Sequence, residues 1–175
     1  MSTTTRFPSP SRWSWSWLFC AVLPLVGCSD GEAVTKQSLA RARSLWARAG
    51  IDDYDLDWTS TGTNNAYYRV RVRAKQVQTV EQVLPDGRTV ELHPGEPRYY
   101  GIDGLFLTLA DEYAQLGTDR PFGKAKGTTA VLRFTPDPKY GFPRSYRRDV
   151  VGSTLPVAID VVRFAPEPPR AKPAL

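Results

Sequence analysis

Two runs in which apolar and charged residues alternate strictly constrain the fold of this chain more than any other feature of its sequence. The apolar positions are Tyr54, Leu56 and Trp58 in the first run and Tyr68, Val70 and Val72 in the second. Aspartates fill the gaps of the first run and arginines fill those of the second. Because alternate side chains of a strand point to opposite faces, each run predicts a strand with one buried and one charged face. The turn-rich residues 61–65 between the runs predict a hairpin.

The charges also predict the register of this hairpin. The apolar side chains of both strands lie on the same face of the sheet only when the numbers of two paired residues have an even sum. A slip of one residue would turn every side chain of one strand to the opposite face. A turn centred on Thr63 satisfies this rule and pairs each aspartate with an arginine. The predicted apolar pairs are Trp58–Tyr68, Leu56–Val70 and Tyr54–Val72. The predicted charged pairs are Asp57–Arg69, Asp55–Arg71 and Asp53–Arg73.

The helical spacing of apolar residues predicts two helices, at residues 32–49 and 101–116. Thr35 suits an inner start of the first helix, and Gly50 suits a left-handed end. The second alternating run is predicted to continue as one strand to Leu84. Further strands are predicted at residues 88–92, 128–135, 144–149 and 155–164. We therefore expect an α+β domain in which two helices cover one face of an antiparallel sheet of five or six strands. In the turn before the strand at 144–149, we expect a positive φ at Gly141.

The first 28 residues combine basic residues, a short apolar run and a cysteine. Arg6 and Arg12 precede the apolar residues 13–26, which are too few to span a membrane as a stable helix. The run ends in the sequence Leu25-Val26-Gly27-Cys28. This sequence resembles the lipobox of bacterial lipoproteins, where signal peptidase II cuts before the cysteine and a diacylglycerol is attached to its sulfur. The resemblance implies lipidation of Cys28, with Leu25, Val26 and Gly27 as the peptidase recognition residues.

Cleavage before Cys28 predicts four parts of the chain: a signal peptide (1–27), a lipidated tether (28–33), a single α+β domain (34–164) and a Pro-rich disordered tail (165–175). Ser29, directly after the cysteine, favours the outer membrane in bacteria that have two membranes. The removed part holds two arginines and no acid, so the formal net charge falls from +5 to +3. The basic composition is then only a weak indication of anionic partners.

Cysteine and histidine are too scarce for several kinds of site. Cys20 lies in the signal peptide and Cys28 carries the lipid, so the mature chain has no free thiol. His93 is the single histidine, in a loop, and no serine-elbow motif accompanies it. Zinc sites of several His or Cys ligands and Cys-His nucleophilic pairs are excluded, and the sequence predicts no cofactor, metal or catalytic residue. The aspartates of the first run lack the glycine turn and distal glutamate of a calcium loop.

Three motifs resemble small bacterial lipoprotein domains of unknown function. These are Trp46 followed by Tyr54, the sequence Ile-Asp-Gly-Leu-Phe at 102–106, and Asp-Pro-Lys-Tyr-Gly-Phe-Pro at 137–143. The resemblance covers residues 37–164, and Tyr-Gly-x-Pro is its most distinctive element. Many members carry a cysteine pair after the first strand, where this chain has Thr59, Ser60 and Thr61. The resemblance implies a fold and a location but no activity.

The best candidate for a ligand-binding surface is the arginine row Arg69, Arg71 and Arg73, with Arg133 as a further cation. Such a face could bind a polyanion, but aspartates on the neighbouring strand could equally neutralise it, and we favour neutralisation. We expect a non-enzymatic binding or accessory lipoprotein of the cell envelope. Its partners would be membrane lipid through Cys28 and an envelope protein or polymer, not nucleic acid. The alternative is a carboxylate-based hydrolase of envelope glycans.

Overall fold

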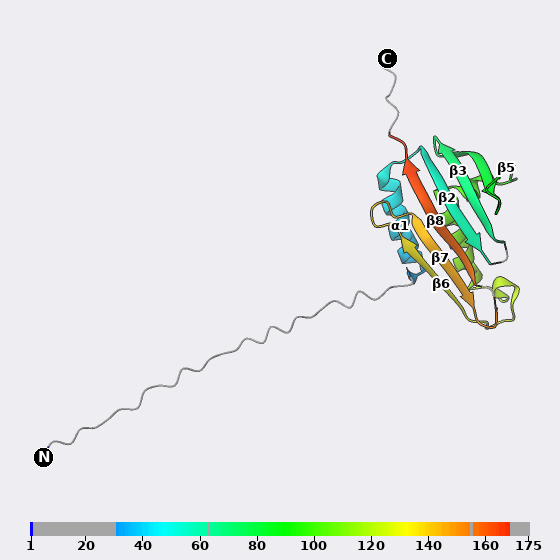
Figure 1. Cartoon of the computed structure of the whole chain (residues 1–175). Helices are drawn as coiled ribbons and strands as arrows, with labels where there is room; N and C mark the ends of the chain where they lie inside the picture. The colour runs from blue at the N-terminus through cyan, green and yellow to red at the C-terminus, as the bar shows by residue number, and fades with distance from the viewer. Residues whose placement is uncertain (2–30, 63, 155, 169–175) are drawn as a thin grey trace.

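The structure, a computed structural model, describes residue 1 and residues 31–62, 64–154 and 156–168. In this part of the chain, one antiparallel sheet carries two α-helices on the same side (Figure 1). The predicted α+β class is therefore confirmed. The opposite face of the sheet carries no helix and is exposed to solvent (Figure 1).

The described residues form eight strands, in the order β1-β6-β7-β8-β2-β3-β4-β5, and all neighbours are antiparallel. The strands are β1 (Glu32–Ala33), β2 (Tyr54–Thr61), β3 (Ala66–Arg73), β4 (Gln76–Val83), β5 (Thr89–Leu92), β6 (Ala130–Pro136), β7 (Pro143–Val150) and β8 (Val157–Pro166). The prediction of five or six strands is thus too low. The difference lies in β1 and in the division of one predicted strand into β3 and β4.

A tight turn at Ala74 and Lys75 separates β3 from β4, where the sequence predicted one strand continuing to Leu84. Both turn residues have a positive φ, 49° and 64°, although neither is glycine. The two residues before β2 hold this turn. The Asp53 carboxylate accepts the Ala74 N–H at 2.6 Å, and the Asp52 carbonyl accepts the Lys75 N–H at 2.8 Å. No Gly, Pro or Asn marks this turn in the sequence, so local turn chemistry could not predict it.

Helix α1 (Lys36–Ala49) begins four residues later than predicted, because Glu32 and Ala33 pair with β6 as strand β1. Thr35 is the N-cap and forms a reciprocal capping box with Ser38. Gly50 ends the helix in the left-handed conformation, as predicted. The helix therefore starts after Thr35, the inner of the two predicted starts, and not at Glu32.

Helix α2 (Ile102–Gln115) starts against the core rather than against solvent. The Ile102 N–H donates to the Tyr54 hydroxyl at 2.9 Å, and the Trp46 indole N–H donates to Asp103 at 3.1 Å. The 3₁₀ helix η1 (Pro97–Tyr100) packs so closely on α2 that a Cβ at Gly104 would lie 2.2 Å from the Arg98 carbonyl oxygen. A second 3₁₀ helix, η2 (Pro121–Gly123), lies in the loop before β6.

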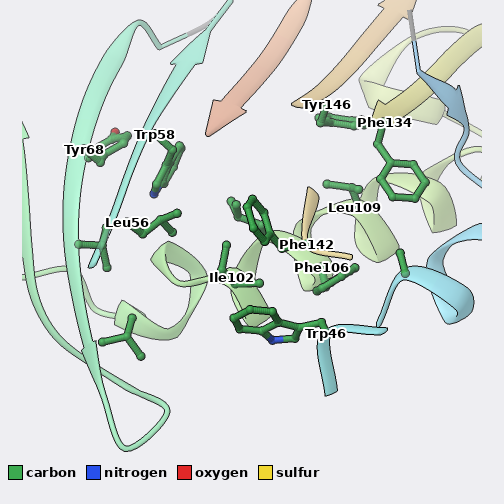
Figure 2. Close-up of a cluster of buried hydrophobic side chains, with 14 of the residues drawn as sticks. Trp46, Leu56, Trp58, Tyr68, Ile102, Phe106, Leu109, Phe134, Phe142 and Tyr146 are labelled. Carbon is green, nitrogen blue, oxygen red and sulfur yellow. The ribbon is translucent and has the colours of Figure 1, made fainter. Parts of the chain in front are cut away.

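The core lies between the sheet and the helices (Figure 2). Its side chains come from both helices and from the alternating apolar positions of the strands. Fully buried examples are Leu56, Val72, Val80, Ile102, Leu105, Phe106, Leu109, Phe134 and Tyr146. The apolar positions of both alternating runs are buried, which confirms the face predicted for each.

Strand β8 extends two residues beyond its predicted end. Ala165 pairs with Asp55, and the Glu167 N–H donates to the Asp53 carbonyl at 2.9 Å, so the start of the predicted tail belongs to the sheet. Residues 169–175 lie outside the described residues. So do residues 2–27 of the predicted signal peptide, which include Leu25, Val26 and Gly27, and the following Cys28 and Ser29. Among the described helices, none has the length and apolar character needed to cross a membrane.

Gly141 provides a test of this packing. Its φ is 80°, as predicted, and a Cβ there would lie 2.5 Å from the Ala42 carbonyl oxygen and 2.8 Å from the Leu45 Cβ. We expect Gly141→Ala to lower the free energy of unfolding by about 2–4 kcal/mol, from the strained φ together with the clash against α1. Denaturant unfolding measures the loss.

Gly87 is the matched control, because its φ is 84° and nothing lies within 4 Å of a Cβ there. Gly87→Ala should cost only the backbone strain, about 1–2 kcal/mol. Equal losses at the two positions would contradict the close contact between the Gly141 turn and α1.

Candidate functional site

The predicted register of the first hairpin is confirmed. Trp58 pairs with Tyr68, Leu56 with Val70 and Tyr54 with Val72. On the open face, Asp57 lies opposite Arg69 and Asp55 opposite Arg71. The third predicted charged pair, Asp53–Arg73, is wrong. Asp53 lies before β2 and its carboxylate binds the turn at Ala74 instead.

Asp57 is the centre of the open face. Its side chain is only 10% exposed although it lies on the side without helices. The Tyr67 hydroxyl donates to it at 3.1 Å, Arg69 lies 3.9 Å away, and Arg163 of β8 lies 3.7 Å away. Burial, followed by the hydrogen bond to Asp57, raises the pKa of Tyr67. A nearly buried carboxylate needs such partners. Arg69 therefore compensates the negative charge of Asp57 and is not available to a ligand.

Arg73 is also used within the protein. Its guanidinium donates to Asp55 at 3.1 Å, to the Tyr54 carbonyl at 3.0 Å and to Glu167. Asp55 therefore pairs diagonally with Arg73 and not with Arg71, its direct cross-strand neighbour. Long side chains reach such diagonal positions across an antiparallel pair.

The other arginines of the sheet, including Arg71 and Arg133 from the prediction, do not gather into one surface. Arg71 is exposed and has no acidic partner within 4 Å among the described residues. Arg133 lies on β6, four strands from β3, which is roughly 19 Å at about 4.8 Å per strand. Arg147 binds Asp160 at 2.8 Å, and Arg148 lies on the helix side of the sheet. Among the described arginines, Arg69, Arg71 and Arg163 line a shared depression of about 100 Å³.

His93 lies exposed directly after β5, in the loop before η1. Within the described ranges, no group of three or more His, Cys, Asp or Glu side chains is arranged to hold a metal ion.

A different site, which we call the aromatic pocket, lies on the helix side of the sheet. It has a volume of about 290 Å³, close to the lower limit of small-ligand pockets. It is lined by residues of β2, β3, η1, α2, β7 and β8 and is open to solvent on one side. Its lining residues are Trp58, Ser60, Thr61, Asn64, Tyr68, Tyr99, Tyr100, Leu105, Thr108, Glu112, Tyr146, Val157 and Ile159.

Three of the aromatic rings support one another. The centroids of Trp58 and Tyr68 lie 4.5 Å apart, and that of Tyr100 lies 5.9 Å from Trp58 and 5.2 Å from Tyr68. The Trp58 indole N–H donates to the Tyr100 carbonyl at 3.1 Å, which ties η1 to the sheet. The rings are thus fixed before any ligand arrives, which lowers the entropic cost of binding.

Glu112 supplies the charged group of the pocket. Arg148 donates to both of its oxygens, at 2.6 and 2.7 Å, and the Tyr146 hydroxyl donates at 2.8 Å. Burial, followed by the negative charge of Glu112, raises the pKa of Tyr146 well above its ordinary value. Tyr146 therefore stays a neutral donor, and Glu112 stays oriented with one lone-pair site of Oε1 left for a further donor.

Sequence reasoning missed this pocket, since it assigned Trp58 and Tyr68 only to the core. Tyr99 and Tyr100 stand in no recognisable motif, and Glu112 is one acid among several on α2. The chain matches no protein-family model and no curated protein.

A double-mutant cycle tests the diagonal ion pair. We expect Asp55→Asn and Arg73→Gln to show a coupling energy of about 0.5–1 kcal/mol in the free energy of unfolding, because their charged groups are partly shielded from water. The matched cycle of Asp55→Asn with Arg71→Gln should give a coupling of about 0.3 kcal/mol or less. A larger coupling in the second cycle would restore the direct pair predicted from the register.

Proposed function

We propose that this chain is a lipid-anchored, non-enzymatic binding domain of the bacterial cell envelope, and that the aromatic pocket receives one ring of an envelope glycan. The observation that carries the proposal is the combination, in one cavity, of a preformed aromatic cluster with an oriented carboxylate. Ligand pockets in proteins combine apolar walls with a few placed polar groups in this way.

The anchor part of the proposal rests on the lipobox-like sequence Leu25-Val26-Gly27-Cys28 and the basic, apolar segment before it. Lipidation at Cys28 would join the first described strand to the membrane through a few residues. The resemblance to small bacterial lipoprotein domains, and Ser29 for the outer membrane, favour the same location.

The glycan part follows from the chemistry of the lining. A sugar ring has an apolar C–H face that packs on aromatic rings and hydroxyl groups at its edge that need hydrogen-bond partners. The Asn64 amide, the Tyr68 and Tyr100 hydroxyls and the Glu112 carboxylate are such partners at the pocket wall. One ring is also what a cavity of about 290 Å³ accommodates.

The alternative, a carboxylate-based glycan hydrolase, would need two acids on either side of a glycosidic bond. Asp55, Asp57 and Glu81 do lie together on the open face, but the depression that they line measures only about 100 Å³. A sugar ring would not be enclosed there. Asp57 is moreover in contact with Tyr67, Arg69 and Arg163. Binding without hydrolysis is therefore the better-supported proposal.

The anchor is tested by Cys28→Ala. Metabolic labelling with a fatty acid should label the wild type and leave the variant unlabelled and unprocessed. Because each acyl chain buries many methylenes at about 0.8 kcal/mol apiece, detergent rather than salt should release the wild type from membranes. Label on the variant would disprove lipidation at this residue.

The pocket is tested by fluorescence. After cleavage before Cys28 the chain keeps two tryptophans, Trp46 and Trp58, so Trp46→Phe leaves a single reporter in the pocket wall. We expect titration with soluble muropeptides or lipopolysaccharide core oligosaccharide to change the Trp58 emission. Thr108→Phe, which fills the pocket from α2, should abolish the change.

Thr79→Phe is the matched control, since Thr79 is also half-buried but lines the depression on the open face. It should leave the response intact. If none of these glycans changes the emission, or if both threonine variants respond alike, the pocket is not the glycan site.

A further inference from the structure

The two helices carry opposite charges. Helix α1 contains Lys36, Arg41, Arg43 and Arg48 and no acid, whereas α2 contains Asp103, Asp111 and Glu112 and no basic residue. Both lie on the same side of the sheet (Figure 1). The helix layer therefore has one cationic and one anionic part.

The cations of α1 surround its exposed face. Ser38, Ala42 and Trp46 are buried, and at 100° per residue the opposite side of the helix carries Ala40, Ser44 and Ala47, which are exposed. Lys36 and Arg43 lie along one margin of these small residues, and Arg41 and Arg48 lie along the other. Gln37 is the one larger side chain between the two margins, and no acidic residue of the helix stands there, so this face could approach a flat surface without charge repulsion.

Most of this charge is uncompensated. Arg41 binds Glu32. Lys36, Arg43 and Arg48 have no acidic partner within 4 Å among the described residues, and Arg43 instead lies over the Phe106 ring at 5.7 Å. A contact with an aromatic ring leaves the positive charge in place.

The sequence places this helix next to the predicted anchor. Glu32, at the start of β1, follows Cys28 by four positions in the sequence, and four fully extended steps span at most about 14 Å. Helix α1 follows β1 after two residues and is roughly 21 Å long at 1.5 Å per residue. A lipid on Cys28 would thus keep α1 within reach of the membrane surface.

We propose that the exposed face of α1 docks on the anionic phospholipid surface into which the Cys28 lipid inserts. This inference rests on the proposed lipid anchor and adds an orientation to it. The arginine row of the sheet is a poorer membrane surface, because Asp55, Asp57 and Glu81 lie among its cations. No residue of α1 lines the aromatic pocket, so docking through α1 leaves that pocket open to a ligand.

Each basic residue near an anionic membrane strengthens partitioning by roughly fivefold, and the attraction decays within a Debye length of about 8 Å at physiological salt. Reversing three cations of α1 should therefore weaken the interaction by well over tenfold. The interaction of α1 with the membrane should also weaken as the salt concentration rises, unlike the insertion of the acyl chains.

The experiment uses the lipidated protein in vesicles of phosphatidylcholine alone or with 30% phosphatidylglycerol. The mature chain has no cysteine besides Cys28, so a polarity-sensitive dye can be attached at Ala47→Cys on α1 or at Ala114→Cys on α2, both exposed positions. We expect a blue shift from the α1 dye only in the anionic vesicles, and none from the α2 dye. The triple change Lys36→Glu, Arg43→Glu, Arg48→Glu should abolish the shift.

The matched control reverses Arg120, Lys124 and Lys126 in the loop that contains η2, with the same change of net charge, and should keep the shift. An α1 dye that does not respond in reconstituted protein, or an equal effect of the two triple changes, overturns the docking inference. Failure of the protein to insert into either vesicle overturns the anchor instead.

Co-sedimentation of the mature chain with Cys28→Ser then decides the docking without the lipid. It should bind anionic vesicles at least tenfold more tightly than neutral ones, and the α1 triple change should remove the difference. Equal binding to both vesicles would refute the docking surface.

Discussion

The packing of this protein depends on Tyr54, which joins the sheet to both helices. Its ring makes an edge contact with Trp46 of α1, with centroids 5.6 Å apart, and packs on Phe164 of β8 at 5.5 Å. Its hydroxyl accepts the first N–H of α2, from Ile102, at 2.9 Å. Burial raises the pKa of Tyr54 well above its ordinary value, so the hydroxyl stays neutral at physiological pH. One side chain of the central strand β2 thus sets where both helices lie.

The position of α2 in turn decides the aromatic pocket. The first N–H of α2 is bound to the Tyr54 hydroxyl, so the preceding η1 must turn closely over the first residues of α2. Gly104 permits this close approach, because it has no side chain. Tyr100 then lies against Trp58 and Tyr68 of the neighbouring strands, and the Trp58 indole holds it there. The proposed ligand site therefore follows from the same contacts that hold the core together.

Charge is divided among three surfaces with different consequences. On the open face of the sheet, Asp57 and Asp55 neutralise Arg69 and Arg73, which makes these two arginines of the row a part of the structure. On α2, Glu112 is held by Arg148 and Tyr146 at the pocket. Of these three surfaces, α1 presents several cations without acids among them, which is why its exposed face is the surface that we assign to the membrane.

The sequence alone determined the buried and charged faces of the first hairpin, its register, the caps of α1 and the positive φ at Gly141. These features follow from local periodicity, complementary charges and turn chemistry. Tertiary structure decided the turn at Ala74 and Lys75, because its support comes from Asp52 and Asp53, more than twenty residues earlier. It also decided strand β1, which exists through pairing with β6, and the diagonal pairing of Asp55 with Arg73. The pocket belongs to the same class, since six elements distant in the chain converge there and no single segment carries a signal for it.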